Sequence, residues 1–510
     1  MADVIVIGGG SGGIPVVARL VESGAEVVLI EAGPDYGALA EGRWPGEILD
    51  AAALATSHDW DYTSGPVTGR EPWTFERARI MGGCSSHNGA IAAVGHHLDY
   101  DSWGLPGWET ETLRPLFDRV LDIMRVRAYE QDEAGPFHSR CLEAAASAGW
   151  RIASDLCDLD ANHSFGLETV NVFEGTRWNT AFAYLDPVRD RQNLTIADEC
   201  LVDRIETTRH GVTVHALRRG RAHTFDADRV VLAAGVYGTP SILQRSGIGD
   251  PVVLGSLGIA VSIDAPLVGT NLHDHPMVNA SRDLGEDLAR WMQDAAASGF
   301  VPEEQTLGKA VSRHAADGVF DLHLFPVCGS TQTSLTNGRA LLEVACMTPR
   351  SRGTVKITSV DPGVAPAIDH GYLSDPDGHD IGVLRHGLEL AEDLLAQPAL
   401  RSVLVDEPRR DLSDEALRRD VQHYYHPVGT TPMGSDPSTS VCDRFGRLHG
   451  DHRILVADAS LMPQIPRANT NIPTIVVGER IAELLVTQLN RSDEEIFGRS
   501  PHERSEGGMI

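Results

Sequence analysis

The first thirty residues alternate between apolar runs and glycines in an order that predicts a strand, a turn, a helix and a second strand. Val4 to Ile7 are apolar and predict a short buried strand. A helix follows, with Pro15 in its first turn and its end at Gly24. Its apolar positions recur at helical spacing, at Val16, Val17, Leu20 and Val21. Val27 to Ile30 then predict the second strand.

The turn between the first strand and the helix carries glycines at Gly8, Gly10 and Gly13, which fit the G-x-G-x-x-G pattern. The first permits the tight turn, the second lets backbone N–H groups approach a pyrophosphate, and the third brings helix and strand together. Glu31 ends the second strand, 18 residues after Gly13, where a carboxylate can accept hydrogen bonds from an adenosine ribose. We therefore predict a dinucleotide site; the pattern alone does not separate NAD from FAD.

The hydrophobic pattern of the remaining chain predicts β-rich runs such as Asn193 to Gly220 and helical runs such as Ile381 to Gln397. No apolar run is long enough for a membrane span, and the first strand starts too early to follow a leader peptide. Seven scattered cysteines without a CxxC pair indicate reduced thiols. We expect a cytoplasmic protein that does not bind membranes.

The net charge bears on which partners the protein can bind. The formal net charge of -29 argues against a nucleic-acid partner, because phosphate binding needs clustered Lys and Arg. It is compatible with a soluble enzyme of 510 residues, long enough to enclose a large cofactor.

Four further segments resemble one known family. They are "ARIMGGCSSHNGAI" (78–91), "AAGVYGTPSILQRSGIG" (233–249), "VGTNLHDHP" (268–276), and the end block from "HPVGTTPMG" (426–434) to "VADASLMPQIPRANTNIPTIVVGERIAELL" (456–485). Together they resemble the glucose-methanol-choline (GMC) oxidoreductases, which are FAD-dependent alcohol oxidases and dehydrogenases. The resemblance implies that the dinucleotide is FAD.

The resemblance also implies an α/β fold in which a Rossmann-like FAD-binding domain carries an inserted substrate domain of antiparallel sheet and helices. We expect a discontinuous FAD-binding domain at 1–135, 190–276 and 423–490. The substrate-binding domain is expected at 136–189 and 277–422. Residues 491–510 are polar and predict a flexible tail, with a subunit-spanning arm of a homodimer as the alternative.

The family's catalytic histidine corresponds to His426 and its partner to Asn471, with Asn469 as the alternative if the register is shifted by two. Alcohol oxidation needs a base for the hydroxyl proton, and a neutral amide can bind the alkoxide without competing for that proton. Pro473 starts a helical pattern just beyond Asn471, so a helix dipole is expected to favour negative charge there. No metal is expected.

Further FAD contacts are implied for Gly82, Asn88 and Asp458, the last with a structural role as its alternative. His87 lies in a "GGCSSHN" run that is nearly identical in choline oxidases, where this histidine carries the flavin covalently through its 8α-methyl group. A flavin covalently linked through His87 is therefore expected; an unlinked histidine that bonds within the turn or lies beside the flavin is the alternative. Cys84 is expected to be a small filler.

The resemblance to choline oxidases ends at the residues that select the substrate. Their glutamate after the "DHP" motif is Met277 here, and their serine two residues after the flavin-linked histidine is Gly89. A histidine of their inserted sheet is replaced by Phe325, with His323 on the same strand. The remaining candidate wall residues are Tyr424 and, more strongly, Tyr425.

A quaternary cation needs a counter-charge or an aromatic cage. The sequence therefore predicts a neutral primary or benzylic-type alcohol. It is oxidised to the aldehyde with hydride transfer to flavin N5, and the covalent-flavin motif favours oxygen as the acceptor. The alternatives are a dehydrogenase with another electron acceptor, a non-redox hydroxynitrile lyase, and an FAD-binding protein without catalysis.

Overall fold

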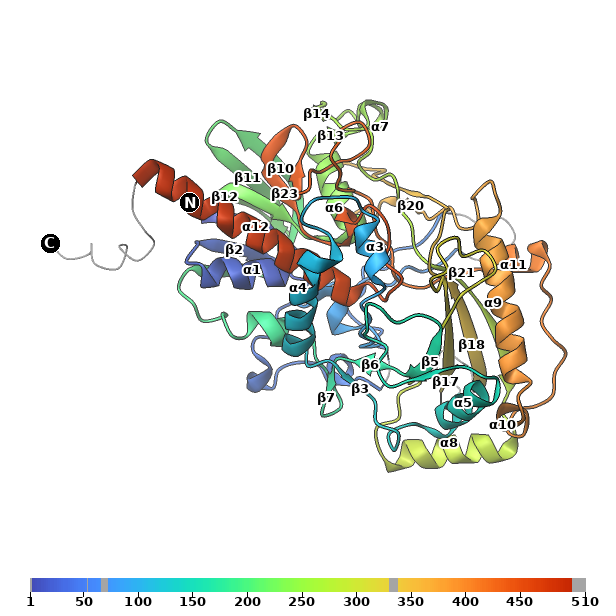
Figure 1. The fold of residues 1–510 in the computed structure, drawn as a ribbon. Coiled ribbons are helices and arrows are strands. Elements are labelled where there is room, and N and C mark those ends of the chain that lie inside the picture. Colours follow the sequence, from blue (N-terminus) through green and yellow to red (C-terminus); the bar gives the residue numbers. More distant parts are fainter. Residues whose placement is uncertain (1, 53, 66–71, 330–337, 498–510) are drawn as a thin grey trace.

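The computed structural model describes residues 2–497 except 53, 66–71 and 330–337. Two sheets organise these residues, one at each end of the molecule, with helices on their outer sides (Figure 1). None of the described helices combines the length and the apolar composition needed to cross a membrane. All seven cysteines are free thiols, as their spacing predicts.

The first sheet is built around the predicted N-terminal unit. Its parallel core consists of β1 (Ala2–Ile7), β2 (Val27–Ile30), β9 (Leu194–Ala197), the end of β12 (Arg221–Leu232) and β23 (Asp451–Val456). β10 (Cys200–Thr208) and β11 (Gly211–Arg218) extend it as antiparallel strands, and the short β22 (Arg447–Leu448) pairs with β23. β2 spans the predicted residues, and α1 (Gly13–Glu22) is the predicted helix.

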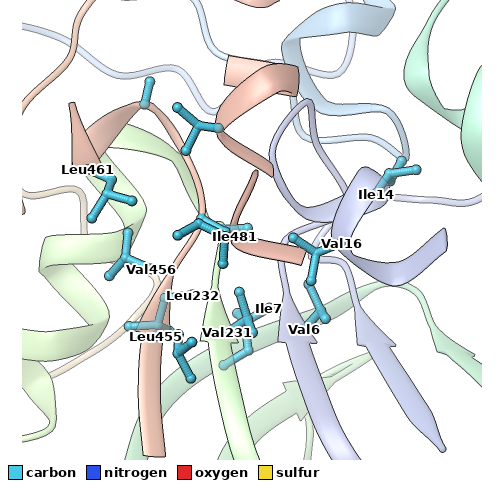
Figure 2. Close-up of a cluster of buried hydrophobic side chains, with 14 of the residues drawn as sticks. Val6, Ile7, Ile14, Val16, Val231, Leu232, Leu455, Val456, Leu461 and Ile481 are labelled. Atoms are coloured by element: carbon cyan, nitrogen blue, oxygen red, sulfur yellow. The ribbon is translucent and has the colours of Figure 1, made fainter. Parts of the chain in front are cut away.

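The parallel strands carry apolar side chains that point toward α1 and α12 (Asn471–Phe497). Figure 2 shows this core: Val6, Val231 and Leu455 come from neighbouring strands, with Val16 of α1 and Ile481 of α12 above them. Because parallel strands covered by helices are buried, their sequences are nearly continuous apolar runs. α12 continues through residues 491–497, so the described part of the predicted tail is helical; residues 498–510 lie outside the described residues.

The second sheet has seven strands in the order β21-β15-β18-β17-β16-β5-β4. Their bounds are β21 (Gln422–His423), β15 (Pro276–Asp283), β18 (Arg339–Cys346), β17 (Leu322–Cys328), β16 (Thr306–Ala310), β5 (Ser164–Leu167) and β4 (Ile152–Ala153). All neighbours are antiparallel except β4 and β5. The sheet thus joins segments from 152 to 423, while the domain boundaries given above stay a prediction.

Helices cover one face of the second sheet, and the other face points toward the side of the molecule that holds the first sheet. The covering helices are α9 (His379–Leu395), which matches the predicted helical run, α5 (Pro136–Ser147) and α8 (Glu286–Ser298), as Figure 1 shows. Side chains of alternate residues, such as Leu322 and Leu324, pack beneath them. The intervening residues, including His323 and Phe325, point to the opposite face.

The remaining helices line the region between the sheets or the outer surface. They are α2 (Gly46–Leu49), α3 (His97–Asp101), α4 (Thr110–Ile123), α6 (Gly235–Arg245), α7 (Pro251–Ser256), α10 (Pro398–Arg401) and α11 (Asp414–Asp420). The short strand pairs are β3 (Arg127–Ala128) with β6 (Thr169–Val170), β7 (Val172–Phe173) with β8 (Thr176–Arg177), β13 (Ile248–Gly249) with β14 (Ile263–Asp264), and β19 (Thr354–Lys356) with β20 (Ala367–Asp369).

Candidate active site

The glycine turn after β1 is packed so closely that side chains are excluded. Gly8 has a φ of +105°, and a Cβ on it would lie 2.2 Å from the Ala233 carbonyl oxygen. A Cβ on Gly13 would lie 2.1 Å from the Gly8 oxygen, so helix α1 starts directly against the turn. Both oxygens of Glu31 accept turn N–H groups, from Gly9 at 2.8 Å and from Gly33 at 2.7 Å. This geometry fits a dinucleotide whose pyrophosphate lies on the helix N-terminus.

A second turn, η2 (Gly83–Ser86), packs against the first. Gly82 has a φ of +94°, and its N–H donates to the Gly9 carbonyl over 2.7 Å. A Cβ on Gly83 would lie 2.7 Å from Cα of Gly10, so these glycines allow the two turns to touch. The "GGCSSHN" run is thereby placed beside the dinucleotide turn, which is where a flavin-contacting segment must lie.

His87 follows directly after η2 and is only 8% exposed. Burial lowers the pKa of His87 to about 4, and the nearby Arg77 guanidinium lowers it further. Its imidazole is therefore neutral and nucleophilic at neutral pH. The side-chain oxygen of Asn88 accepts the Ala90 N–H over 3.0 Å and its carbonyl accepts a hydrogen bond from Arg177 over 2.6 Å; contact of Asn88 with a flavin stays a prediction.

His426 lies in the segment after β21, buried to 8% exposure. Its Nδ1 is 3.2 Å from Nδ1 of His275, so the two rings contact each other through these atoms and Nε2 of His426 takes no part in this contact. Burial, followed by the nearby His275 and His323, lowers the pKa of His426 well below its ordinary value. The imidazole is therefore present as a base rather than as a cation.

Asp274 fixes the two histidines relative to each other, a role that the sequence did not predict. Its Oδ1 accepts the backbone N–H of His275 at 2.8 Å and of His426 at 3.0 Å, and its Oδ2 accepts the Tyr372 hydroxyl at 2.9 Å. Burial raises the pKa of Asp274 to about 6. The "HDHP" segment is part of a family motif, and the position of its acidic residue between two histidines is the feature from which the role of Asp274 could have been predicted.

Asn471 begins helix α12, and Ser11 of the glycine turn orients its amide. The Ser11 hydroxyl donates to Asn471 Oδ1 over 2.7 Å, while the buried Nδ2 has no hydrogen-bond partner. The side-chain oxygen of Asn469 is also buried without a partner. Pro473 lies in the first turn of α12, as its sequence position suggests. Asn471 thus offers two N–H donors at a helix N-terminus.

Asp458 is fully engaged by protein groups. It accepts the N–H of Gly235 and of Ser460, both at 2.8 Å, and the Thr239 hydroxyl at 2.6 Å. These contacts join the start of α6 to the segment after β23, which supports the structural role given above as the alternative. A contact of Asp458 with FAD stays a prediction.

Metal binding finds little support among the described residues. Two groups bring three potential ligand atoms within 4.8 Å of one another: Asp274, His275 and His426, and Cys346, His379 and Asp380. In both groups the carboxylate already accepts two backbone N–H bonds. The first group is better explained by acid–base chemistry at His426.

The wall opposite the histidines comes from the second sheet. Met277, Phe325 and Tyr424 belong to one apolar cluster on its inner face. The Tyr424 ring centroid lies 4.6 Å from that of His426 and 5.9 Å from that of Phe325. Tyr425, which the sequence favoured, instead packs edge-on against His423 and is 37% exposed, because its φ of +64° breaks the alternation of the segment. His323 points to the same region, with both ring nitrogens unpartnered.

Comparison with known proteins agrees with this site. Models of the GMC oxidoreductase family match residues 2–277 and 349–478. The chain is 32% identical to choline oxidase of Arthrobacter globiformis, covering 95% of this chain and 94% of that protein. It is also 32% identical to 5-(hydroxymethyl)furfural oxidase of Methylovorus sp., covering 95% and 99%. Among solved structures, pyridoxine 4-oxidase from Mesorbium loti superimposes with a TM-score of 0.82 at 25% identity, covering 95% and 99%. The chain belongs to the GMC oxidoreductase family and is an FAD-dependent oxidoreductase that acts on an alcohol group.

Proposed function

We propose that the protein oxidises a primary or benzylic-type alcohol to the aldehyde, with His426 as the base and oxygen as the final electron acceptor. Two observations carry the proposal: the imidazole of His426 is buried with a lowered pKa, and the amide N–H groups of Asn471 have no protein partner. FAD, when bound, supplies the acceptor for the hydride that leaves the alcohol carbon. The apolar wall of Met277, Phe325 and Tyr424 suits the body of such a substrate.

The proton is handled by His426. Its Nε2 takes the hydroxyl proton, and its low pKa keeps it ready to do so across the neutral range. Nδ1 of His275, 3.2 Å from Nδ1 of His426, stabilises the imidazolium that forms by accepting its second N–H. Asn471 Nδ2 donates to the alcohol oxygen as negative charge develops there, and the N-terminus of α12 adds its dipole.

We also propose that His87 carries the flavin covalently. Such a bond would replace the imidazole N–H hydrogen of His87 and one hydrogen of the flavin 8-methyl carbon by a C–N bond, with oxygen taking up both hydrogens as hydrogen peroxide. The low pKa of His87, about 4, supports this because the attacking nitrogen must be unprotonated. After acid denaturation, the yellow colour should stay with the wild-type chain and leave a His87→Ala variant. His58→Ala, a change at a partly buried neighbouring histidine, is the control. Colour that leaves the wild-type chain would refute the bond.

The activity is tested by anaerobic reduction with a panel of primary and benzylic alcohols, read as bleaching of the flavin. His426→Gln should slow bleaching by about 100- to 10,000-fold, because general-base catalysis contributes that much. The exposed His452→Gln is the matched control. Equal rates for His426→Gln and wild type would refute the assignment. Reoxidation by oxygen that is slower than turnover with an artificial acceptor would instead indicate a dehydrogenase.

A further inference from the structure

Three glutamates that the sequence did not single out gather beside the apolar wall. Glu168 follows β5, Glu304 precedes β16, and Glu343 lies within β18. Glu343 is directly opposite Phe325 in the β17–β18 pair, so both point to the inner face of the sheet. A Cβ on Gly89 would lie 2.8 Å from Oε2 of Glu304, which places this carboxylate against the flavin turn. The cluster therefore lies between the second sheet and the proposed flavin site.

The described part of the chain provides no counter-ion for these carboxylates. Among the described residues, no ion pair or hydrogen bond reaches any of the three carboxylates, and both oxygens of Glu168 are buried without a partner. Burial raises the pKa of Glu304 to about 8 and that of Glu343 to about 7; Glu343 and Glu303 raise that of Glu304 further by repulsion. Buried carboxylates are costly unless a cation or hydrogen-bond donors compensate them. The described residues supply no such partner to the buried Glu168, or to Glu304 and Glu343, which are partly exposed.

The hydroxyl of Tyr424 is a second unsatisfied group in the same place. Tyr424 is 5% exposed, and its buried hydroxyl has no hydrogen-bond partner. Burial raises the pKa of Tyr424, and the fields of Glu343, Glu168 and Glu304 raise it further, so the ring lies within reach of all three charges. The same ring packs against His426, with centroids 4.6 Å apart. Tyr424 thus packs against the imidazole of His426 and also lies near the carboxylates of Glu168, Glu304 and Glu343.

We propose that the alcohol substrate carries a protonated primary or secondary amine at the end remote from its hydroxyl, bound by Glu304 and Glu343 with Glu168 and Tyr424 behind them. This inference rests on the alcohol oxidation proposed above. An ammonium with N–H donors satisfies both the charge and the empty acceptor atoms. A quaternary ammonium supplies charge but no N–H, and a neutral alcohol supplies no charge. The absence of a glutamate at Met277 therefore does not leave the site without counter-charge.

The test compares matched alcohols on the holoenzyme by anaerobic flavin reduction. The probes are 4-(aminomethyl)benzyl alcohol, its carbon isostere 4-ethylbenzyl alcohol and its N,N,N-trimethyl derivative, together with 6-aminohexan-1-ol and 1-heptanol. Charge-assisted hydrogen bonds favour each amine over its isostere by about 10-fold or more in kcat/KM. The trimethyl derivative should fall below the primary amine.

Glu304→Gln and Glu343→Gln should lower kcat/KM for the amine more than for the isostere and bring their ratio close to 1. Both changes keep the side-chain volume and remove an uncompensated charge, so thermal unfolding should occur at an equal or higher temperature. Glu286→Gln is the matched control because Glu286 is exposed in the first turn of α8, on the helix-covered side of the sheet. This control should retain the amine preference.

The ratio of amine to isostere should also rise with pH through about 7 to 8, where Glu343 and Glu304 ionise in the free enzyme. Among the described residues, the groups that interact with Glu304 are Glu168, Glu303, Glu343, Tyr129, Tyr424 and Tyr425, and none of them is cationic. Proton uptake by His426 affects both probes equally and cancels in the ratio.

Several outcomes overturn the amine site. Equal rates for amine and isostere do so, as does a trimethyl derivative that outperforms the primary amine. Equal losses for both probes in Glu304→Gln and Glu343→Gln also refute it. In each of these cases the flavin is still bleached, so alcohol oxidation stands. If neither amine bleaches the flavin, the amine site is wrong; if no alcohol of the wider panel bleaches it, the proposed function is wrong as well.

Discussion

The hydrogen bond from Ser11 to Asn471 offers the sharpest test of how the catalytic amide is oriented. It spans 2.7 Å between residues 460 positions apart. Because the Ser11 hydroxyl occupies Oδ1, the Nδ2 group of Asn471 points away from the glycine turn and remains free to donate. Ser11→Ala removes this constraint and leaves both backbones and the amide itself in place.

The expected loss follows from the size of one hydrogen bond. A bond between neutral groups contributes about 0.5 to 1.5 kcal/mol, so flavin reduction slows by about 2- to 13-fold if all of it is expressed in the transition state. Asn471→Ala removes the donor itself, and losses on the order of 100-fold or more are typical of that change. Since Ser11 acts through Asn471, Ser11→Ala should add almost nothing to Asn471→Ala.

The assay is single-turnover anaerobic flavin reduction, with rates normalised to bound flavin. Normalisation matters because Ser11 lies in the dinucleotide turn, so a change in FAD content must be separated from a change in rate. Ser23→Ala is the matched control: its hydroxyl donates to the Leu20 carbonyl over 2.7 Å at the other end of α1. An unchanged rate for Ser11→Ala, or full additivity with Asn471→Ala, would refute the orienting role.

Three further predictions concern the frame around the site. The pKa of Asp274 is raised to about 6, so its contribution to stability is present below about pH 4 and is lost as the pH rises through 6. Asp274→Asn should therefore flatten the dependence of the unfolding temperature on pH between these values. An unchanged dependence would contradict the raised pKa of Asp274. Gly13→Ala places a Cβ 2.1 Å from a backbone oxygen and should lower FAD content, measured by absorbance after purification, whereas Gly46→Ala, which meets nothing within 4 Å, should not. Arg77→Met removes the 2.9 Å bond to the Tyr425 carbonyl and should lower kcat several-fold; full activity would show that Tyr425 keeps its φ of +64° without that bond.

The parts of the fold that could be predicted are those in which neighbours along the chain decide the conformation. The strand from Val27 to Ile30 and the helix that begins at Gly13 follow from apolar period and glycine position alone. The helix beginning at Asn471 was also expected, but its extension to Phe497 was not. Residues 491–495 are polar, and helix propagation from a packed segment costs far less than nucleation.

The parts that could not be predicted depend on contacts between distant segments. Ser11 is an unremarkable residue of a glycine turn until α12 brings Asn471 to it. Tyr425 seemed the better wall residue because it precedes His426, yet the left-handed backbone at Tyr425 turns its ring away and gives that place to Tyr424. A single positive φ at a non-glycine residue is invisible to side-chain periodicity.

The proposed amine site also depends on contacts between distant segments. A neutral alcohol was expected because Met277 replaces one glutamate, but the field in a pocket is a sum over all groups that face it. Glu168, Glu304 and Glu343 lie in three separate stretches, and only the pairing of β5, β16, β17 and β18 brings them together. The buried Glu168 and the partly exposed Glu304 and Glu343 together create a demand for a cation or bound protons. A ligand that supplies the cation would relieve that demand only while bound, so the same three charges that destabilise the free enzyme would favour an ammonium over its carbon isostere.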